Sequence, residues 1–342
     1  MKKTSERPTI EGVAKMANVS VATVSRIING SASVSKPTML RVQEAIDTLG
    51  YVPNLSARNL RKGESCVVLI MAPNFTNPYY SHILSGICDT AQSFGYSAFI
   101  CSGKTSSGEA TMREILKTKR ADGAIMLTCN YDDAWLNKDA SRFPMVQCSE
   151  AADGVELPYV SIDNYRAMRD SVAHVCSLGH TRISFITIDN KFLSTRLRYQ
   201  GYHDEIVEQL GEAAFQPELI SRTVDYSFES GRKAALQQLS SNNRPTALVC
   251  CSDVLALGAI AAAHELGLQV PRDLSVVGFD DVDYTKMFHP YLTTIQQPCY
   301  ELGCQSMRML QKCIAAGQNT AERIILPHEV KVRESTARRA NP

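Results

Sequence analysis

The sequence predicts an α/β protein that begins with an all-α helix-turn-helix headpiece and a hinge helix, followed by a core of parallel sheets in two subdomains. Two observations predict this fold class. The first 50 residues contain three helical patterns with clear start and stop signals, and short apolar runs alternate with amphipathic stretches from Cys66 onward. The length of 342 residues also favours two or three folding units.

Three short helices are predicted before residue 51. Each begins after a capping residue and ends at a residue that tolerates a helix terminus. The starts are Thr9, Ser20 and Ser35, and the ends are Asn18, Asn29-Gly30 and Gly50. Apolar residues at helical spacing would form the buried faces: Val13, Ala14, Ala17, Val24, Ile27, Ile28, Val42, Ile46 and Leu49.

The second of these helices, within "VSVATVSRIING", has the features of a DNA-reading helix. In a helix-turn-helix unit its first residues face base edges in the major groove. Val21 and Ala22 can contact a thymine methyl group, and Arg26 can bond to guanine O6 and N7. The residues predicted to contact DNA are Ser20, Val21, Ala22, Thr23, Ser25, Arg26 and Asn29. The alternative is that Val21 and Ala22 pack under a neighbouring helix as ordinary core residues.

The distribution of charge supports a nucleic-acid contact at one end of the chain. Residues 1–63 carry ten Lys or Arg and four Asp or Glu, a net charge of +6. The remaining residues carry 26 basic and 31 acidic side chains, a net charge of −5. A basic segment on an acidic body is typical of this arrangement.

A short basic segment, "NLSARNLRKG" at residues 54–63, links the headpiece to the core. It is too short to remain helical in isolation, so we expect it to fold on DNA with Leu60 as a wedge in the minor groove. Its predicted DNA contacts are Asn54, Ala57, Arg58 and Leu60. A plain flexible linker is the alternative.

The core is predicted to contain parallel strands buried on both faces. The apolar runs are "CVVLIMAP", "YSAFICS", "GAIMLT", "PMVQCS", "RISFITI", "TALVCCS" and "LSVVGFD". The pattern pauses at residues 160–167, which indicates two subdomains facing each other across a cleft. Ligands of such folds bind beyond the carboxyl ends of strands. The predicted effector-binding residues are Asn74, Tyr79, Tyr80, Ser149, Glu150, Arg198, Tyr226, Ser252 and Asp280.

Several protein classes are disfavoured. The eleven cysteines form no C-x-x-C pair, so we expect reduced thiols and no metal knuckle or disulfide framework. Residues 1–9 lack the apolar core of a secretion signal, and no apolar run approaches ~20 residues, so a cytoplasmic location is expected. No G-x-S-x-G, P-loop or G-x-G-x-x-G motif is present, and neither catalysis nor a cofactor is predicted. The acidic group Asp280, Asp281 and Asp283 leaves open a metal site or, more commonly, ligand or loop hydrogen bonding.

Long stretches of the chain resemble the lactose/galactose repressor family. They include "TIEGVAKMANVSVATVSRIING", "VSKPTMLRVQEAIDTLGYVPNLSARNLRKG", "RLRYQGY", "CCSDVLALGAI", "VPRDLSVVGFDD", "LTTIQQP" and "VRESTARR". The similarity covers nearly the whole chain. Two stretches, "ELPYVSIDN" and "YSFESGRKAALQQL", most resemble the cytidine repressor branch of that family.

The resemblance implies a periplasmic-binding-protein-like (type I) core whose two subdomains are joined by three crossovers, in a homodimer on a pseudo-palindromic operator. The implied segments are 1–63 for the headpiece and hinge helix, 64–163 and 293–325 for the N-terminal subdomain, and 164–292 and 326–342 for the C-terminal subdomain. It also implies that Tyr79 and Tyr80 stack on an effector, that Arg198 grips its hydroxyl groups or carboxylate, that Tyr226 forms an aromatic wall, that Asp280 accepts sugar hydroxyls, and that Leu60 intercalates.

This chain departs from the family pattern at three places. Gly12 stands where the family usually has Asp, which removes a favourable charge and lowers helix propensity by ~1 kcal/mol, so low headpiece stability is expected. No leucine-heptad tail follows Arg339, so a tetramer is not expected. Ser149 and Glu150 occupy positions that vary among members, which leaves the ligand open.

The function that these features predict is a sequence-specific transcriptional regulator, most simply a repressor, whose operator affinity is set by a sugar or nucleoside in the core cleft. The same fold serves induction and corepression, and the sequence does not choose between them. The alternatives are a solute-binding protein, which predicts a signal peptide and no headpiece, and an enzyme of a sugar or nucleoside pathway, which needs a nucleophile or base in the cleft.

Overall fold

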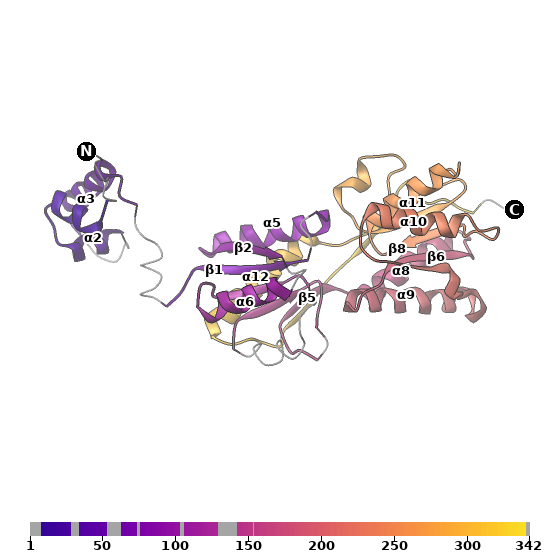
Figure 1. Ribbon diagram of the computed structural model, residues 1–342, viewed down its shortest axis with the longest axis horizontal. Helices are drawn as coiled ribbons and strands as arrows, with labels where there is room; N and C mark the ends of the chain where they lie inside the picture. The colour runs from indigo at the N-terminus through magenta and orange to yellow at the C-terminus, as the bar shows by residue number, and fades with distance from the viewer. Residues whose placement is uncertain are drawn as a thin grey trace. The chain divides into compact units, whose positions relative to one another are not determined.

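The computed structural model describes residues 8–28, 34–52, 63–73, 76–102, 106–128, 142–152 and 154–339. The chain divides into two compact units, Met1–Ser65 and Cys66–Pro342 (Figure 1). The two units differ in their secondary structure. Helices with capped ends form the first unit, and parallel sheets with helices on their faces form the second.

The headpiece contains α1 (Ile10–Met16), α2 (Val21–Ile28) and α3 (Lys36–Leu49). Thr9 Oγ1 accepts a hydrogen bond from the Gly12 amide at 3.2 Å, and Ser20 Oγ accepts one from the Thr23 amide at 3.1 Å. Gly50 ends α3 with a left-handed φ of 60°. These three helices, their first two caps and the Gly50 terminus confirm the prediction. Asn29 and Gly30 lie outside the described residues.

One predicted cap differs in detail. Ser35 precedes α3 with extended backbone, but its side chain accepts no amide hydrogen bond. Its hydroxyl group instead bonds to the Thr38 hydroxyl at 2.9 Å. The Ser35 side chain therefore satisfies none of the free backbone N–H groups at the start of α3.

Small side chains form the headpiece core. The fully buried residues are Val13, Ala14, Ala17, Val24, Val42 and Ala45. The other predicted core residues, Ile27, Ile28, Ile46 and Leu49, pack against this cluster but are only partly buried. A core of this size gives limited hydrophobic stabilisation.

Two six-stranded sheets form the second unit. The first has the order β11-β5-β4-β3-β1-β2, with all its pairs parallel. Its strands are β1 (Val67–Ala72), β2 (Ser97–Ser102), β3 (Gly123–Met126), β4 (Met145–Cys148), β5 (Tyr159–Ile162) and β11 (Arg323–Leu326). The second has the order β12-β10-β9-β8-β6-β7, with only β12 antiparallel. Its strands are β6 (Ile183–Ile188), β7 (Ile220–Thr223), β8 (Ala247–Cys250), β9 (Ser275–Asp280), β10 (Thr293–Gln296) and β12 (Glu329–Lys331).

Helices cover both sheets (Figure 1). Those associated with the first sheet are α5 (Pro78–Ser93), α6 (Ser106–Lys117) and α12 (Cys299–Ala316). Those associated with the second are α8 (Asn164–Ser177), α9 (Leu193–Leu210), α10 (Phe228–Leu239) and α11 (Asp253–Glu265). Short 3-10 turns are η1 (Glu212–Ala214), η2 (Pro217–Leu219) and η3 (Asp283–Lys286). Helices α5 and α12 pack closely at Gly86 because glycine has no side chain. A Cβ at this position would lie 2.0 Å from the Tyr300 carbonyl oxygen.

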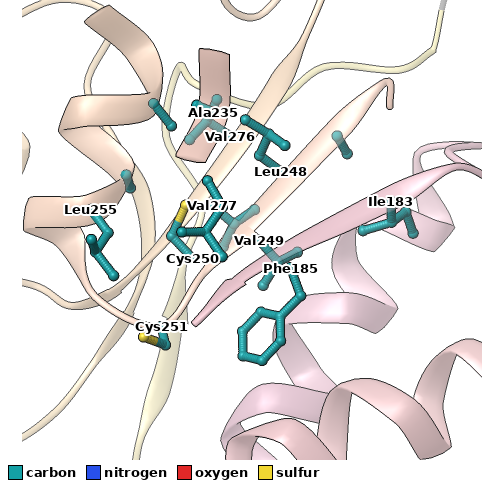
Figure 2. Close-up of a cluster of buried hydrophobic side chains, with 14 of the residues drawn as sticks. Ile183, Phe185, Ala235, Leu248, Val249, Cys250, Cys251, Leu255, Val276 and Val277 are labelled. Atoms are coloured by element: carbon teal, nitrogen blue, oxygen red, sulfur yellow. The ribbon is translucent and has the colours of Figure 1, made fainter. Parts of the chain in front are cut away.

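The strands that the apolar runs predict are all present, and all of them except β2 are buried. Strand β2 lies at the edge of the first sheet and has four exposed residues, so the prediction that it is buried on both faces is wrong. All six residues of β6 are buried. Figure 2 shows Phe185, Val249 and Val277 side by side on neighbouring strands, with Leu255 of α11 on one side and Cys251 at the end of β8. This burial on both faces explains why the strands are continuous apolar runs. Across the described part of the chain, no helix combines the length and the apolarity needed to cross a membrane.

The chain passes between the sheets three times, after β5, after β10 and after β11. The second passage differs from the expected boundary, which assigned residues 293–325 to the N-terminal subdomain. Strand β10 (Thr293–Gln296) pairs with β9 and so belongs to the second sheet. Thr294 is fixed there because its buried hydroxyl group donates to Asp253 Oδ1 at 2.5 Å.

Candidate nucleic-acid interface and ligand site

The exposed face of α2 carries the residues predicted to read DNA. Val24 is fully buried, whereas Val21 is 41% exposed and Ala22 and Arg26 are also exposed. Val21 and Ala22 are thus not packed under a neighbouring headpiece helix. Ser25 and Thr23 are half-buried at the edge of this face. The first turn of α2 contains no acidic residue, so the positive end of the helix dipole is not neutralised there.

Five predicted DNA contacts lie outside the described residues: Asn29, Asn54, Ala57, Arg58 and Leu60. Their roles stay predictions. Within α2, Ser20 and Thr23 also serve the helix start, because their hydroxyl groups bond to each other at 2.9 Å.

Tyr79 stands at the start of α5, where Asn77 caps the helix by accepting from the Tyr79 amide at 3.1 Å. Its hydroxyl group lies 2.7 Å from Ser149 Oγ and 3.3 Å from Gln297 Oε1. The ring of Tyr80 meets that of Tyr79 edge to face, with centroids 5.1 Å apart. Both tyrosines are buried, and burial raises the pKa of each phenol, so both remain neutral hydrogen-bonding groups.

Arg198 is a buried guanidinium on α9 that is held from three sides. It lies over the Phe279 ring, 3.7 Å from the centroid. Its Nε donates to Asn164 Oδ1 at 2.9 Å and its Nη1 donates to the Cys251 carbonyl oxygen at 2.7 Å. Among the described residues no group accepts a hydrogen bond from Nη2, although only 6% of the residue is exposed. This nitrogen is available to a ligand.

Asp280 ends β9 in a conformation that is rare for a residue with a side chain, with φ at 120°. Its Oδ1 accepts from Gln297 Nε2 at 2.8 Å. Burial raises the pKa of Asp280 to about 7, while the charge of Arg198 and the Gln297 hydrogen bond lower it. Ser149, which follows β4, is also left-handed with φ at 71°. Strained backbone at two strand ends that meet one site is typical of functional positions.

Glu150 connects the two subdomains. Its Oε2 accepts from the Ser194 amide at 3.2 Å, and its Oε1 accepts from the Ser194 hydroxyl. Ser194 is in the first turn of α9, whose N-cap residue Phe192 provides no side-chain cap. The carboxylate therefore takes the place of a cap from across the cleft. Burial raises the pKa of Glu150, and the Ser194 hydrogen bonds oppose this effect.

The remaining predicted effector residues are placed as follows. Tyr226 lines a cavity of about 410 Å³ together with Asn77 and Phe228. Burial raises the pKa of Tyr80 most, followed by Tyr226 and the charges of Glu150 and Asp280, while the charge of Arg198 lowers it. Ser252 caps α11 by accepting from the Leu255 amide at 3.3 Å, so its hydroxyl is engaged in the helix. Asn74 lies outside the described residues.

Four residues that contact the predicted effector residues were not themselves predicted: Asn164, Ser194, Phe279 and Gln297. Asn164 follows β5 and Gln297 follows β10, so the rule that ligand sites lie beyond the carboxyl ends of strands could have found both. Phe279 and Ser194 carried no comparable signal, because stacking under Arg198 and pairing with Glu150 are tertiary contacts.

The acidic group at the end of β9 is divided among separate partners. Asp281 pairs with Arg333 and with Lys286, the latter at 3.5 Å, and Asp283 lies 3.3 Å from His82. Within the part of the chain that the structure describes, no cluster of three His, Cys, Asp or Glu side chains could hold a metal ion. Contacts within the protein engage both Asp281 and Asp283.

A helix-turn-helix unit joined to a core with polar side chains gathered at strand ends defines the class of effector-controlled DNA-binding regulators. Residues 9–54 match the model of the bacterial regulatory proteins of the lacI family, and residues 172–336 match the periplasmic binding protein-like domain. The chain is 38% identical over 314 residues to the HTH-type transcriptional repressor CytR of Escherichia coli K12, covering 90% of each chain. The chain belongs to the LacI family, and it is a DNA-binding transcription regulator.

Solved structures agree with this assignment. The lac repressor dimer bound to operator and the anti-inducer ONPF matches with a TM-score of 0.86 at 28% identity, over 97% of this chain and all of that chain. The transcriptional regulator CelR in complex with cellobiose matches with a TM-score of 0.73 at 29% identity, over 96% of this chain and all of that chain. The predicted fold class, headpiece and periplasmic-binding-protein-like core are confirmed.

Proposed function

We propose that the chain represses transcription by binding a pseudo-palindromic operator as a homodimer, with a sugar or nucleoside as its effector. The observation that carries the effector site is Arg198, a buried guanidinium whose Nη2 has no hydrogen-bond partner among the described residues and whose charge lowers the pKa of Asp280. A ligand hydroxyl or carbonyl oxygen is a suitable partner for Nη2, and its hydroxyl donors suit Asp280.

The DNA contact is proposed for the exposed face of α2. Val21 and Ala22 would contact thymine methyl groups and Arg26 a guanine, with Ser20, Thr23 and Ser25 at phosphates and Asn29 as a further DNA contact. The hinge residues Asn54, Ala57, Arg58 and Leu60 would follow the minor groove. We assign residues 1–63 to DNA binding and residues 64–342 to effector binding and dimerisation.

We place the dimer contact on apolar side chains that the described surface leaves uncovered. Phe99 and Ile100, 55% and 43% exposed, lie on β2 at the edge of the first sheet, and Met287 and Phe288 follow η3 with exposures of 57% and 68%. A second copy is the partner that a palindromic operator requires. Phe288→Glu should therefore shift the sedimentation coefficient of the full chain towards that of a monomer and weaken operator binding. An unchanged dimer would place the contact elsewhere.

The ligand class follows from the mixture of groups at the site. Arg198 and Asp280 suit a ring with several hydroxyl groups, and the rings of Tyr79, Tyr80 and Tyr226 suit a planar or pyranose face. Both a sugar and a nucleoside carry these features. The resemblance to the cytidine repressor branch favours the nucleoside.

The mechanism that we propose is a shift of population. A ligand in the cleft contacts residues of both subdomains, so it binds one arrangement of the subdomains better than the other. If that arrangement separates the two hinge segments of the dimer, both Leu60 wedges are lost together and operator affinity falls. We also propose that the chain acts in the cytoplasm, where DNA is accessible and thiols stay reduced, and that it is not an enzyme.

The test of this function uses the full chain and two-fold symmetric DNA. Selection from a random duplex pool should enrich a palindromic site, and a thermal-shift screen of sugars, nucleosides and purines should reveal the effector. The same ligand must then change operator affinity in fluorescence anisotropy. Binding without preference for a symmetric duplex, in the presence and absence of these compounds, would contradict the proposal. Turnover of a nucleoside or sugar would indicate an enzyme instead.

A further inference from the structure

Gln297 is a buried side chain in the segment that leaves the second sheet and enters the helix covering the first. It follows β10 and precedes α12 by two residues, and it is 5% exposed. Together with Asp280 it lines a cavity of about 380 Å³. No role was predicted for this residue. Because Gln297 lies between the two subdomains, its hydrogen bonds can join residues of both.

The two ends of the Gln297 amide have different partners. Nε2 donates to Asp280 Oδ1 at 2.8 Å, and Oε1 accepts from the Tyr79 hydroxyl at 3.3 Å. The opposite orientation of the amide would place its oxygen against the carboxylate, so the observed one is favoured. Because the Tyr79 hydroxyl donates to Gln297, it accepts from Ser149 Oγ at 2.7 Å. The donors therefore run in one direction, from Ser149 through Tyr79 to Gln297, and Gln297 donates in turn to Asp280.

This chain of hydrogen bonds determines what Asp280 offers to a ligand. Oδ1 is occupied by Gln297, which leaves Oδ2 to accept a ligand donor. A carboxylate can do this, whereas a protonated carboxyl group would donate and lose acceptor capacity. The ionisable groups that interact with Asp280 are Arg198 on α9, Tyr79 and Tyr80 on α5, Cys251 after β8, Asp253 on α11 and Cys299 on α12. His82, Asp281, Asp283 and Lys286 line the same cavity as Asp280. Arg198 and the neutral Gln297 donor are the two groups that lower the pKa of Asp280 and so favour its ionised form.

We propose that Gln297 is the positioning residue of the effector site, which holds Asp280 as an ionised acceptor and joins it to Tyr79 of the other subdomain. This inference rests on the proposed function, because it takes Asp280 as the effector's acceptor. It goes further in making the acceptor depend on the subdomain arrangement. Tyr79 belongs to the subdomain of the first sheet and Asp280 to that of the second, so moving one against the other breaks a bond of Gln297.

The experiment that tests the positioning role needs no ligand. The full chain labelled with ¹³C at aspartate carboxyl groups is titrated by NMR, with Asp280→Asn used to assign the resonance. Burial raises the pKa of Asp280 to about 7, and a hydrogen bond to the carboxylate lowers it. Gln297→Met removes that bond, and the Asp280 midpoint should rise by about one pH unit. Gln296→Met is the matched control, because the neighbouring glutamine donates to Asp281 Oδ2 at 2.9 Å and should leave Asp280 unchanged.

A second variant keeps the test decisive if methionine disturbs the fold. Gln297→Glu has the same shape and retains the acceptor for Tyr79, but it places a second carboxyl group against Asp280 and should raise the midpoint further. A midpoint that does not move in either folded variant would overturn the proposal. Tyr79→Phe, which leaves the Gln297 donor in place, should give a smaller rise than Gln297→Met, and a larger one would also overturn it.

Ligand binding separates this proposal from the proposed function. Cytidine and D-ribose, as probes of the two effector classes, are titrated into the full chain by thermal shift between pH 5.5 and 8.5. Stabilisation by either probe should weaken as the pH falls through the Asp280 midpoint, and Gln297→Met should move this profile upward by the displacement seen by NMR. If the pH profile of ligand stabilisation is the same in Gln297→Met as in the wild type, the proposed role of Gln297 is overturned. If neither probe binds while the NMR displacement is present, the effector class is wrong and the positioning of Asp280 by Gln297 stands.

Discussion

Replacing Asp280 by Asn should stabilise the fold while it removes the charge that the site offers to a ligand. Burial raises the pKa of this carboxyl group from 3.8 to about 7, against the lowering effects of Arg198 and Gln297. The carboxyl group therefore binds its proton more tightly in the folded state than in the unfolded chain. The free-energy cost of ionising Asp280 in the folded protein is therefore absent below pH 3.8 and grows until the pH has passed 7.

The size of the effect follows from these two pKa values. Their difference of about 3 corresponds to a cost on the order of 4 kcal/mol at pH 8, where the carboxylate is ionised in both states. At pH 5.5 it is neutral in the folded state and ionised in the unfolded chain, so about 2 kcal/mol of that cost remains. Asparagine has nearly the same shape, carries no charge and retains an oxygen that accepts from Gln297. Asp280→Asn should thus be more stable than the wild type at both pH values, with the larger gain at pH 8.

Urea unfolding of the full chain, followed by circular dichroism at pH 8 and pH 5.5, measures this gain. The control is Asp281→Asn, since Asp281 is buried in ion pairs with Arg333 and Lys286 and its replacement should destabilise the chain. A variant at Asp280 that is no more stable than the wild type at pH 8 would refute the reasoning. A gain of equal size at both pH values would also refute it, because the cost would then not arise from ionisation.

Four other substitutions test the headpiece and the ligand site. Arg26→Ala should cost about 1 to 3 kcal/mol of operator affinity and relax the preference at one base position, which anisotropy with single-base operator variants would detect; unchanged selectivity would remove Arg26 from the groove. Arg198→Ala should abolish the effector response and leave operator binding intact, and loss of both would indicate a folding role. Gly12→Ala should stabilise the headpiece by about 0.5 to 1 kcal/mol, since a Cβ there meets Leu49 Cδ1 at an ordinary 3.8 Å. Gly50→Ala should do the opposite because Gly50 has a φ of 60°, and amide hydrogen exchange would show both changes or contradict them.

Sequence patterns predicted the strands that are apolar throughout and missed those whose burial depends on polar partners. The runs around β1 and β6 read directly as buried strands. Strand β10 contains two threonines, and Thr294 is buried only because Asp253 accepts its hydroxyl hydrogen. Strand β5 has four buried residues but includes Tyr159 and Ser161, so it appeared as a pause in the pattern. Edge strand β7 is only partly buried and has no apolar run.

The sequence predicted Tyr79, Arg198 and Asp280 as candidate ligand residues, which stays a prediction, and it missed the side chains that hold Arg198 and Asp280. Tyr79, Arg198 and Asp280 lie at strand ends or on motifs that resemble the family. Asn164 and Gln297 act through amide hydrogen bonds to Arg198 and Asp280, which are 34 and 17 residues away along the chain. Pairings over such separations depend on how the two sheets are placed, and no local spacing encodes them.

The candidate ligand site contains several groups whose backbone conformation or burial is unfavourable. Ser149 and Asp280 have left-handed backbones, and burial disfavours the charge of Asp280. The Nη2 of Arg198 has no hydrogen-bond partner among the described residues. A protein selected for stability alone would replace Ser149 and Asp280, because each left-handed backbone costs on the order of 1 to 3 kcal/mol and the buried charge of Asp280 costs on the order of 4 kcal/mol at pH 8. A ligand that bonds to both Arg198 and Asp280 satisfies their hydrogen bonds in one arrangement of the subdomains only. We expect relief of these unfavourable terms to contribute to the differential affinity that the proposed effector control requires.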